Sequence, residues 1–238
     1  MSPQGPRFAS TRWSLVVRAQ GDSEEASAAL AQLCEAYWHP LYCFLRRGRV
    51  SPESAEDLVQ AFTLGLLEGR VLTGANRERG RFRAYLLGAL KNFQANQRRH
   101  AQAQVRGGGQ KALSFDFAAG EASYQIEPTH DLTPEKLFER RWALTVIERA
   151  LEALASEAEA RGEGALHRRL QPYLSGEGRA PYAELSQETG QSVESLRARV
   201  SRLRKRCRER IRQEVRETLG SPDEVDQEVR HLFEALGS

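Results

Sequence analysis

The chain has 238 residues, of which 40% are hydrophobic and 28% are charged, and its formal net charge is +3. This is the composition of a folded globular protein of one or two domains, and it excludes a disordered chain. No apolar run approaches the roughly 18 residues of a membrane-spanning helix, and the stretch MSPQGPRFASTRW lacks the apolar core of a signal peptide, so we expect a cytoplasmic protein without a membrane partner.

The charges are distributed unevenly along the chain. Residues 77–106 contain eight Arg or Lys against one acid, and residues 193–216 contain ten against three. Residues 51–68 carry four acids and no base, and residues 217–238 carry six acids and one Arg. Two basic blocks in a nearly neutral chain indicate a polyanion that is contacted at two places. The acidic blocks indicate protein partners, or a screen for the basic blocks.

Helical periodicity dominates the first half of the chain, and no alternating run of Val, Ile and Thr predicts a strand. Residues 24–46 predict a helix or a helix pair. Pro40 should kink or break it, because proline costs about 3 kcal/mol in a helix interior. Ser51 followed by Pro52 predicts the start of a second helix. A third helix should run from Arg81 to about Gln104.

A linker and a second helical block should follow. Residues 107–132 mix glycine, serine and isolated aromatics, which is typical of a linker. Helices are expected from Thr133 to about Ala160 and over 165–174. The acidic segment 217–238 predicts a short amphipathic helix that packs on the second block, covers its basic face in the free protein, or forms a small structural cap.

Motifs of enzymes and metal sites are absent from the sequence. Cys34, Cys43 and Cys207 are widely spaced and form no CxxC pair, which speaks against a disulfide framework or a zinc site. We expect Cys34 and Cys43 to be small core residues. The sequence contains no HExxH, GxxxxGK[ST] or GxSxG motif, and its histidines are scattered. We therefore expect neither an enzyme nor a bound metal or cofactor.

The most diagnostic stretch follows Pro181 and has the order of a helix-turn-helix. Tyr182–Thr189 predicts a short first helix. Gly190 supplies the positive φ angle that ends it, and Ser192 can cap the next helix. A helix, a glycine turn and a capped basic helix in this order favour a DNA-binding module.

An apolar stripe should anchor the second helix of this module, since Leu196, Val200 and Leu203 recur at helical spacing. The rest of that helix is mainly basic, and a major groove admits an α-helix whose Arg and Lys contact guanines and phosphates. A basic helix that only faces solvent is the alternative. The candidate contacts are Ser192, Glu194, Ser195, Arg197, Arg199, Ser201, Arg202, Arg204 and Lys205.

Several motifs together resemble the extracytoplasmic-function (ECF) sigma factors of bacterial RNA polymerase. Residues 182–206 resemble the module that reads the promoter −35 element. AEDLVQ at 55–60 and RFRAYL at 81–86 resemble the helices of the other module, with the family's paired polar residues at Lys91-Asn92 and Arg98-Arg99. The resemblance implies an all-α protein of two helical domains joined by a linker, the second containing the helix-turn-helix.

The resemblance also implies how the chain is divided and what each part does. The expected segments are an N-terminal extension (1–23), a polymerase-binding and −10-melting domain (24–106), the linker (107–132), the −35 domain (133–216) and an acidic extension (217–238). The implied partners are core RNA polymerase, through its β′ clamp and β flap, and promoter DNA. An anti-sigma factor as a further partner is left open.

Site residues of the first domain carry over from the matching motifs. The implied polymerase contacts are Glu56, Asp57, Leu58, Gln60 and Phe62. The implied −10 contacts are Asn76, Arg77, Arg79, Arg81, Phe82, Lys91, Asn92, Asn96, Arg98 and Arg99. Such factors need no catalytic group, because stacking a flipped base on an aromatic returns about 1–3 kcal/mol of the cost of unpairing it. Tyr85 and Phe93 are expected in the core.

One departure from the family pattern keeps a second function open. The family usually continues its polymerase-binding helix with Glu and, two positions later, Phe, where this chain has Ala61 and Thr63. Loss of the Glu removes a charge-assisted contact worth about 1–3 kcal/mol. The alternative is therefore a helix-turn-helix regulator, derived from a sigma factor, that binds DNA but no longer serves polymerase.

Overall fold

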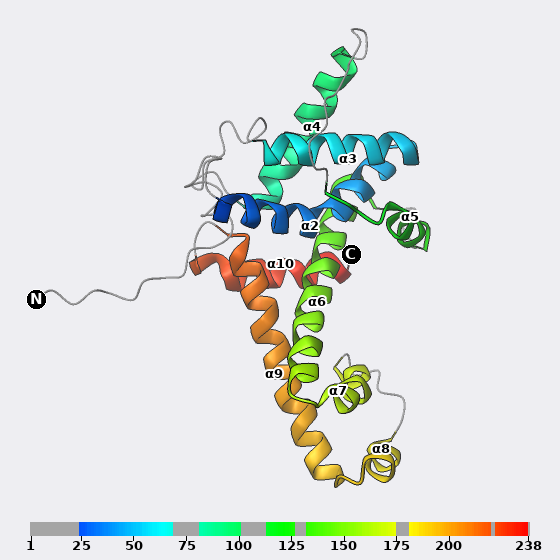
Figure 1. Ribbon diagram of the computed structural model, residues 1–238, viewed down its shortest axis with the longest axis vertical. Helices are drawn as coiled ribbons and strands as arrows, with labels where there is room; N and C mark the ends of the chain where they lie inside the picture. Colours follow the sequence, from blue (N-terminus) through cyan, green and yellow to red (C-terminus); the bar gives the residue numbers. More distant parts are fainter. Residues whose placement is uncertain are drawn as a thin grey trace, which may run out of the picture. The chain divides into compact units, whose positions relative to one another are not determined.

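The computed structural model describes residues 24–68, 81–100, 113–126, 132–174, 181–219 and 222–237. These residues are mainly helical and include no strand, which confirms the all-α prediction for this part of the chain (Figure 1). The helices are α2 (Glu24–Arg47), α3 (Pro52–Leu67), α4 (Phe82–His100), α5 (Phe117–Ile126), α6 (Pro134–Ala160), α7 (Gly164–Leu170), α8 (Tyr182–Thr189), α9 (Val193–Glu217) and α10 (Val225–Gly237). Two 3₁₀ turns, Gln171–Tyr173 and Pro222–Glu224, precede α8 and α10.

The described residues form two compact units. Unit 1 contains the described residues up to Leu144 together with those from Arg216 onward, and unit 2 is Thr145–Val215. One boundary falls inside α6, and the other falls two residues before the end of α9. The acidic C-terminal segment is thus part of unit 1. None of the described helices is both long and apolar enough to cross a lipid bilayer.

The predicted break at Pro40 is wrong, because α2 continues through this residue to Arg47. Proline removes one backbone donor from the helix. On either side of it, however, Tyr37, Leu41 and Leu45 are almost completely buried, and α2 packs against α3, α4 and α5. The burial of this face outweighs the local cost of the proline. Cys34 and Cys43 are free thiols buried in the same core, as predicted.

The start of α3 has the cap that the sequence predicts. The backbone N–H of Ser54 donates to Oγ of Ser51 over 3.3 Å, and Pro52 is the first helical residue. This capping satisfies one of the N–H groups that a helix start leaves unpaired. Along the helix, Ala55, Val59 and other apolar residues face the core.

The predicted linker contains a helix, α5, which packs against the C-terminal half of α2 (Figure 1). Phe115 stacks on Trp38 with ring centroids 5.3 Å apart, and Phe117 meets the same indole edge-on at 5.2 Å. A Cβ atom at Gly120 would lie 2.9 Å from Cη2 of Trp38, so only glycine permits this close approach. Aromatic contacts with α2 therefore order a segment whose composition resembles a linker.

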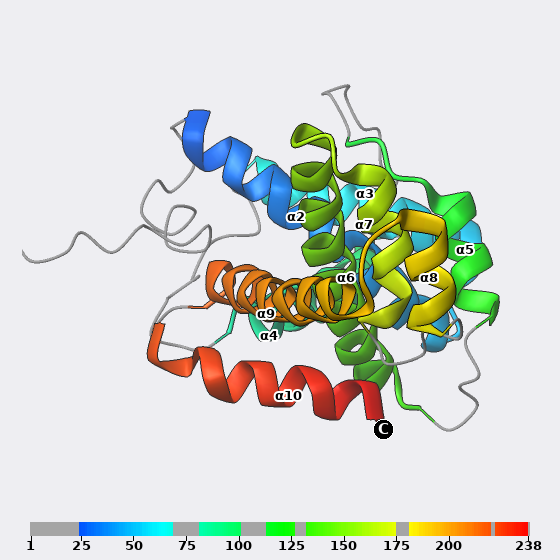
Figure 2. The ribbon, with the colours of Figure 1, turned by 90° about the horizontal axis from the view of Figure 1, so that it is seen from below.

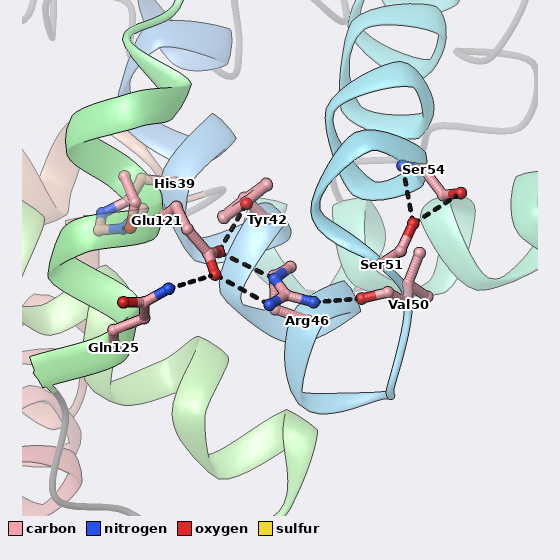
Figure 3. Close-up of polar contacts among 9 residues, drawn as sticks. His39, Tyr42, Arg46, Val50, Ser51, Ser54, Glu121 and Gln125 are labelled. Atoms are coloured by element: carbon pink, nitrogen blue, oxygen red, sulfur yellow. Dashed lines mark hydrogen bonds and ion pairs between the residues drawn. The ribbon is translucent and has the colours of Figure 1, made fainter.

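A half-buried polar cluster fixes α5 on α2 (Figure 3). The carboxylate of Glu121 accepts two hydrogen bonds from the Arg46 guanidinium, each 2.9 Å long, and one of 2.7 Å from the hydroxyl of Tyr42. Nε2 of His39 lies 3.2 Å from the carbonyl of Gly120. The Arg46 hydrogen bonds lower the pKa of Glu121 to about 2, and burial lowers the pKa of His39 to about 4. The carboxylate is therefore charged and the imidazole neutral near pH 7.

Unit 2 has its own apolar core, built where α6, α7, α8 and the first half of α9 meet. Its members include Leu154 of α6, Leu170 of α7, Leu185 of α8 and the predicted stripe Leu196, Val200 and Leu203 of α9. Figure 2 shows α7 and α8 on the same side of α9. The ring of Tyr173, in the 3₁₀ turn after α7, packs on that of Tyr182 in α8 with centroids 4.8 Å apart. The stripe therefore anchors α9 within its own unit.

Candidate nucleic-acid interface

The connection from α8 to α9 is a tight turn made by glycine and a serine cap. Gly190 has φ of 67°, a left-handed conformation that favours glycine, and its N–H donates to the carbonyl of Ser186. The N–H of Ser195 donates to Oγ of Ser192 over 3.2 Å. Ser192, a predicted DNA contact, thus uses its hydroxyl to cap α9. Sequence reasoning gave both roles, and the structure assigns the capping role.

One flank of α9 is held by carboxylates of α6 and of the turn after it. Arg206 and Arg210 both form ion pairs with Glu157, and Nη1 of Arg199 lies 3.3 Å from Glu163. Hydrogen bonds, from Arg210 foremost, lower the pKa of Glu157, so this carboxylate stays charged at neutral pH. Arg199, a predicted DNA contact, is therefore partly neutralised within unit 2.

The other flank of α9 is held by α8 and the 3₁₀ turn before it. The guanidinium of Arg197 lies over the ring of Tyr182, 5.6 Å from its centroid, which is within the roughly 6 Å of a cation–π contact. Nη2 of Arg204 donates to the carbonyl oxygen of Tyr173 over 2.7 Å. Both arginines remain exposed. They position α9 and still present charge at the surface.

The crest of α9 between these flanks carries cations that have no partner within the described part of the chain: Arg202, Lys205 and Arg208. All three side chains are exposed and lie at helical spacing of three. Ser201 and Glu194 are exposed on the same side, and Ser195 is half-buried. We define the basic crest as Arg202, Lys205 and Arg208. Arg208 was missed from the sequence, although its spacing from Arg202 and Lys205 could have identified it.

Two of the predicted −10 residues, Phe82 and Arg81, contact other residues of unit 1. Phe82 is only 1% exposed and packs edge-on against Tyr37 at 5.3 Å. The ring of Phe82 therefore belongs to the core in this conformation, in which it is not available for the predicted −10 contact. Nε of Arg81 lies 2.8 Å from Oε2 of Glu228 in α10.

A buried ion cluster joins α10 to the start of α4 and to α6. Glu228 is completely buried and pairs with both Arg81 and Arg83. Arg83 is 3% exposed, pairs also with Glu139, and lies 4.3 Å from the centre of the Trp142 ring. Burial lowers the pKa of Arg83, and the charge of Glu139 opposes that change. The acidic tail thus contacts the first basic block, whereas the sequence suggested packing on the second.

The remaining predicted −10 residues are exposed or lie outside the described residues. Nζ of Lys91 donates to Glu135 over 2.8 Å, and both side chains are about half exposed. Asn92 and Asn96 are exposed on α4. Asn76, Arg77 and Arg79 lie outside the described residues, as do the side chains of Arg98 and Arg99.

The predicted polymerase contacts on α3 divide into exposed and buried residues. Asp57 and Gln60 are exposed, and Glu56 and Leu58 are half-buried. Phe62 is 0% exposed and packs on Phe93 with centroids 5.7 Å apart. A polymerase contact by Phe62 is therefore wrong here, because a fully buried ring reaches no partner.

Thr63, which stands where the ECF family usually has Phe, also lies in the core. Its side chain is buried, and its hydroxyl donates to the carbonyl of Val59 over 2.8 Å. A residue that faces the core forms no contact with a partner, so Thr in place of Phe changes the packing of α3 and leaves its exposed face as it was. Ala61 is half-buried beside that face.

Comparisons with protein-family models, with curated proteins and with solved structures return no match for this chain.

Proposed function

We propose that this chain is an alternative sigma factor that acts in the cytoplasm. It would bind core RNA polymerase through α3, read the −35 element of a promoter with α9, and contact the −10 element with α4. The α8–α9 pair would be a helix-turn-helix, with the two units serving as the two DNA-binding domains of such a factor.

The observation that carries this proposal is the basic crest of α9. Three cations stand exposed and without a protein partner, on a helix whose opposite face is locked by Leu196, Val200 and Leu203. Unpaired cations on a rigid helix can release counterions from a phosphate backbone without first breaking ion pairs. The flanking arginines are held in place by protein groups, which orients the crest.

The exposed face of α3 supports the polymerase-binding part of the proposal. Glu53, Asp57 and Gln60 are all exposed there, and no basic residue occurs in the helix. Such a face complements a partner helix rich in arginine, and charge complementarity steers association. The polymerase β′ clamp would be that partner, and the β flap would meet unit 2.

The −10 part of the proposal depends on a rearrangement of unit 1. Arg81 is engaged by Glu228 and Phe82 is buried in the described conformation. Lys91, Asn92 and Asn96 remain exposed along α4. We propose that these three make the first contacts with DNA and that Arg81 contributes only after α10 leaves it.

A second candidate function is favoured by the burial of Phe82. A DNA-binding regulator that does not melt a promoter needs no free aromatic at the start of α4, and Phe82 is buried. Such a protein would bind duplex DNA through the basic crest and would not associate with core polymerase.

The test combines a binding measurement for each partner. Full-length protein with Asp57→Ala is compared with Glu234→Ala, an exposed acidic residue on α10, for co-elution with core polymerase at modest ionic strength. Arg202→Ala is compared with Arg169→Ala, an exposed arginine of α7 that pairs with Glu188, for binding to duplex DNA. The proposal expects Asp57→Ala to weaken co-elution and Arg202→Ala to cost about 1–3 kcal/mol of DNA affinity. A chain that binds DNA through Arg202 but never co-elutes with polymerase would be the regulator.

A further inference from the structure

Unit 2 contains a cavity of about 310 Å³ between the end of α6, α7 and the first half of α9. Its polar lining consists of Arg161, Glu163, His167, Arg199, Arg202 and Arg206, and the rest is aliphatic. This volume is at the lower end of the range of small-molecule sites, roughly 300–1,000 Å³. Such sites are usually lined by apolar side chains with a few polar groups, whereas six of the ten residues that line this cavity are charged or polar.

The charge of the lining is strongly positive, because four guanidinium groups face a single carboxylate. Glu163 shares its carboxylate between Nη1 of Arg199 at 3.3 Å and Nε of Arg161 at 3.4 Å, both near the upper limit of a hydrogen bond. Arg206 pairs with Glu157, which does not line the cavity. Arg202 has no partner among the described residues. Since each guanidinium has five N–H donors, the two carboxylates leave most of them available.

A buried histidine lines the same cavity. His167 is 7% exposed, and its Nε2 atom has no hydrogen-bond partner in the described part of the chain. Burial is the main cause that lowers the pKa of His167, and Arg206 of α9, Arg161 and its own neighbour Arg168 act in the same direction against Glu159. A buried polar nitrogen without a partner is costly, and an anion in the cavity would give it one.

We propose that this cavity binds the phosphate group of a small phosphorylated molecule, held by Arg161, Arg199, Arg202 and Arg206 with His167 as a further donor. Guanidinium forks match phosphate oxygens in geometry and charge, and four of them converge here, one from the turn after α6 and three from α9. The aliphatic wall would contact the rest of the molecule. The inference concerns unit 2 alone and does not depend on the proposed function.

DNA is the other source of phosphate groups, because Arg199 and Arg202 are also candidate DNA contacts. A backbone phosphate would have to enter a cavity in which His167 is almost completely buried. We therefore assign the site to a small molecule and make DNA an arm of the test.

The test uses inorganic pyrophosphate as the probe and full-length protein at constant ionic strength. Isothermal titration calorimetry measures its affinity for wild-type protein, for Arg202→Gln and for Arg169→Gln, whose arginine is exposed on α7 and does not line the cavity. Arg202→Gln should weaken binding at least about tenfold, as expected for one lost charge-assisted contact, and Arg169→Gln should bind as wild type. The His167 ring resonances, assigned with His167→Gln, should shift on titration of the wild type.

Three outcomes would overturn the inference. These are no measurable pyrophosphate binding, equal affinity in the Arg202 and Arg169 variants, or binding that leaves the His167 resonances unmoved. In the DNA arm, a duplex whose binding needs Arg202, in a protein that does not bind pyrophosphate, would assign the arginines to the DNA backbone and likewise overturn it.

Discussion

Replacing Glu228 with glutamine should strongly destabilise unit 1. Glu228→Gln keeps the shape of the side chain and removes the negative charge that is completely buried between Arg81 and Arg83. Among the described residues, Arg83, only 3% exposed, would then retain Glu139 as its one anionic partner. Removing one member of a buried ion pair costs about 3–5 kcal/mol, and because one partner remains we expect about 3 kcal/mol.

Urea unfolding followed by tryptophan emission measures this change in the correct unit. Trp38 and Trp142, the tryptophans within the described ranges, both belong to unit 1, and Arg83 lies directly over Trp142. With a typical slope of about 2 kcal/mol per molar urea, the midpoint should fall by roughly 1.5 M.

The matched control is Glu234→Gln on the same helix. The side chain of Glu234 is 76% exposed and lies 3.9 Å from His231, so its replacement should change stability by less than about 0.5 kcal/mol. Equal midpoints for the two variants would refute the reasoning, because the buried ion cluster would then add nothing to the stability of unit 1.

Other predictions follow from the contacts of α5 and of unit 2. The free energy of unfolding of unit 1 should decrease as the pH falls from about 6.5 to 4. In this range His39 becomes protonated in the unfolded chain but stays neutral in the folded protein, where its pKa is about 4. It should decrease again between about pH 4.5 and 2 as Glu121 loses its charge. Acid titration followed by tryptophan emission should show only this lower step in His39→Gln. An unchanged upper step in that variant would contradict its assignment to His39. Gly120→Ala should cost about 1–3 kcal/mol, because its Cβ would lie 2.9 Å from Trp38, and a urea midpoint equal to wild type would mean that α5 does not pack as described. Leu196→Ala should cost about 2–5 kcal/mol in unit 2, measured by thermal unfolding with circular dichroism, and a change below about 1 kcal/mol would exclude a core role.

Local signals in the sequence predicted the ends of several helices correctly. Ser51 with Pro52, and Gly190 with Ser192, act through hydrogen bonds and φ angles of residues close in the chain. Periodicity likewise predicted the buried stripe of α9, because spacing along one helix determines which side chains share a face.

Features that depend on contacts between distant residues could not be predicted. Helix α5 is ordered by Trp38 and Arg46, which lie about eighty positions earlier in the chain, and no local signal announces it. The position of α10 depends on Glu228 meeting Arg81 and Arg83. Net charge suggested that the acidic tail contacts the second basic block, but the two blocks have similar charge and the contacts of Glu228 lie in the first.

In the candidate site too, local patterns predicted some features, and contacts between distant residues determine the others. Exposure of Asp57, Gln60 and the basic crest agrees with what an amphipathic pattern predicts. The burial of Phe62 and Phe82 differs from the roles that the family resemblance implies for them. An aromatic residue in a motif can serve either a partner or the core, and only packing against Phe93 and Tyr37 shows which.

Run-off transcription tests the proposed function most directly. Purified chain and core RNA polymerase are incubated with a template that carries the region upstream of the chain's own gene, and the transcript is quantified with the Asp57→Ala and Arg202→Ala variants beside the Glu234→Ala and Arg169→Ala controls. We expect a defined transcript that both controls support and that each of the two site variants reduces. A chain that binds this DNA but yields no transcript with core polymerase would contradict the assignment.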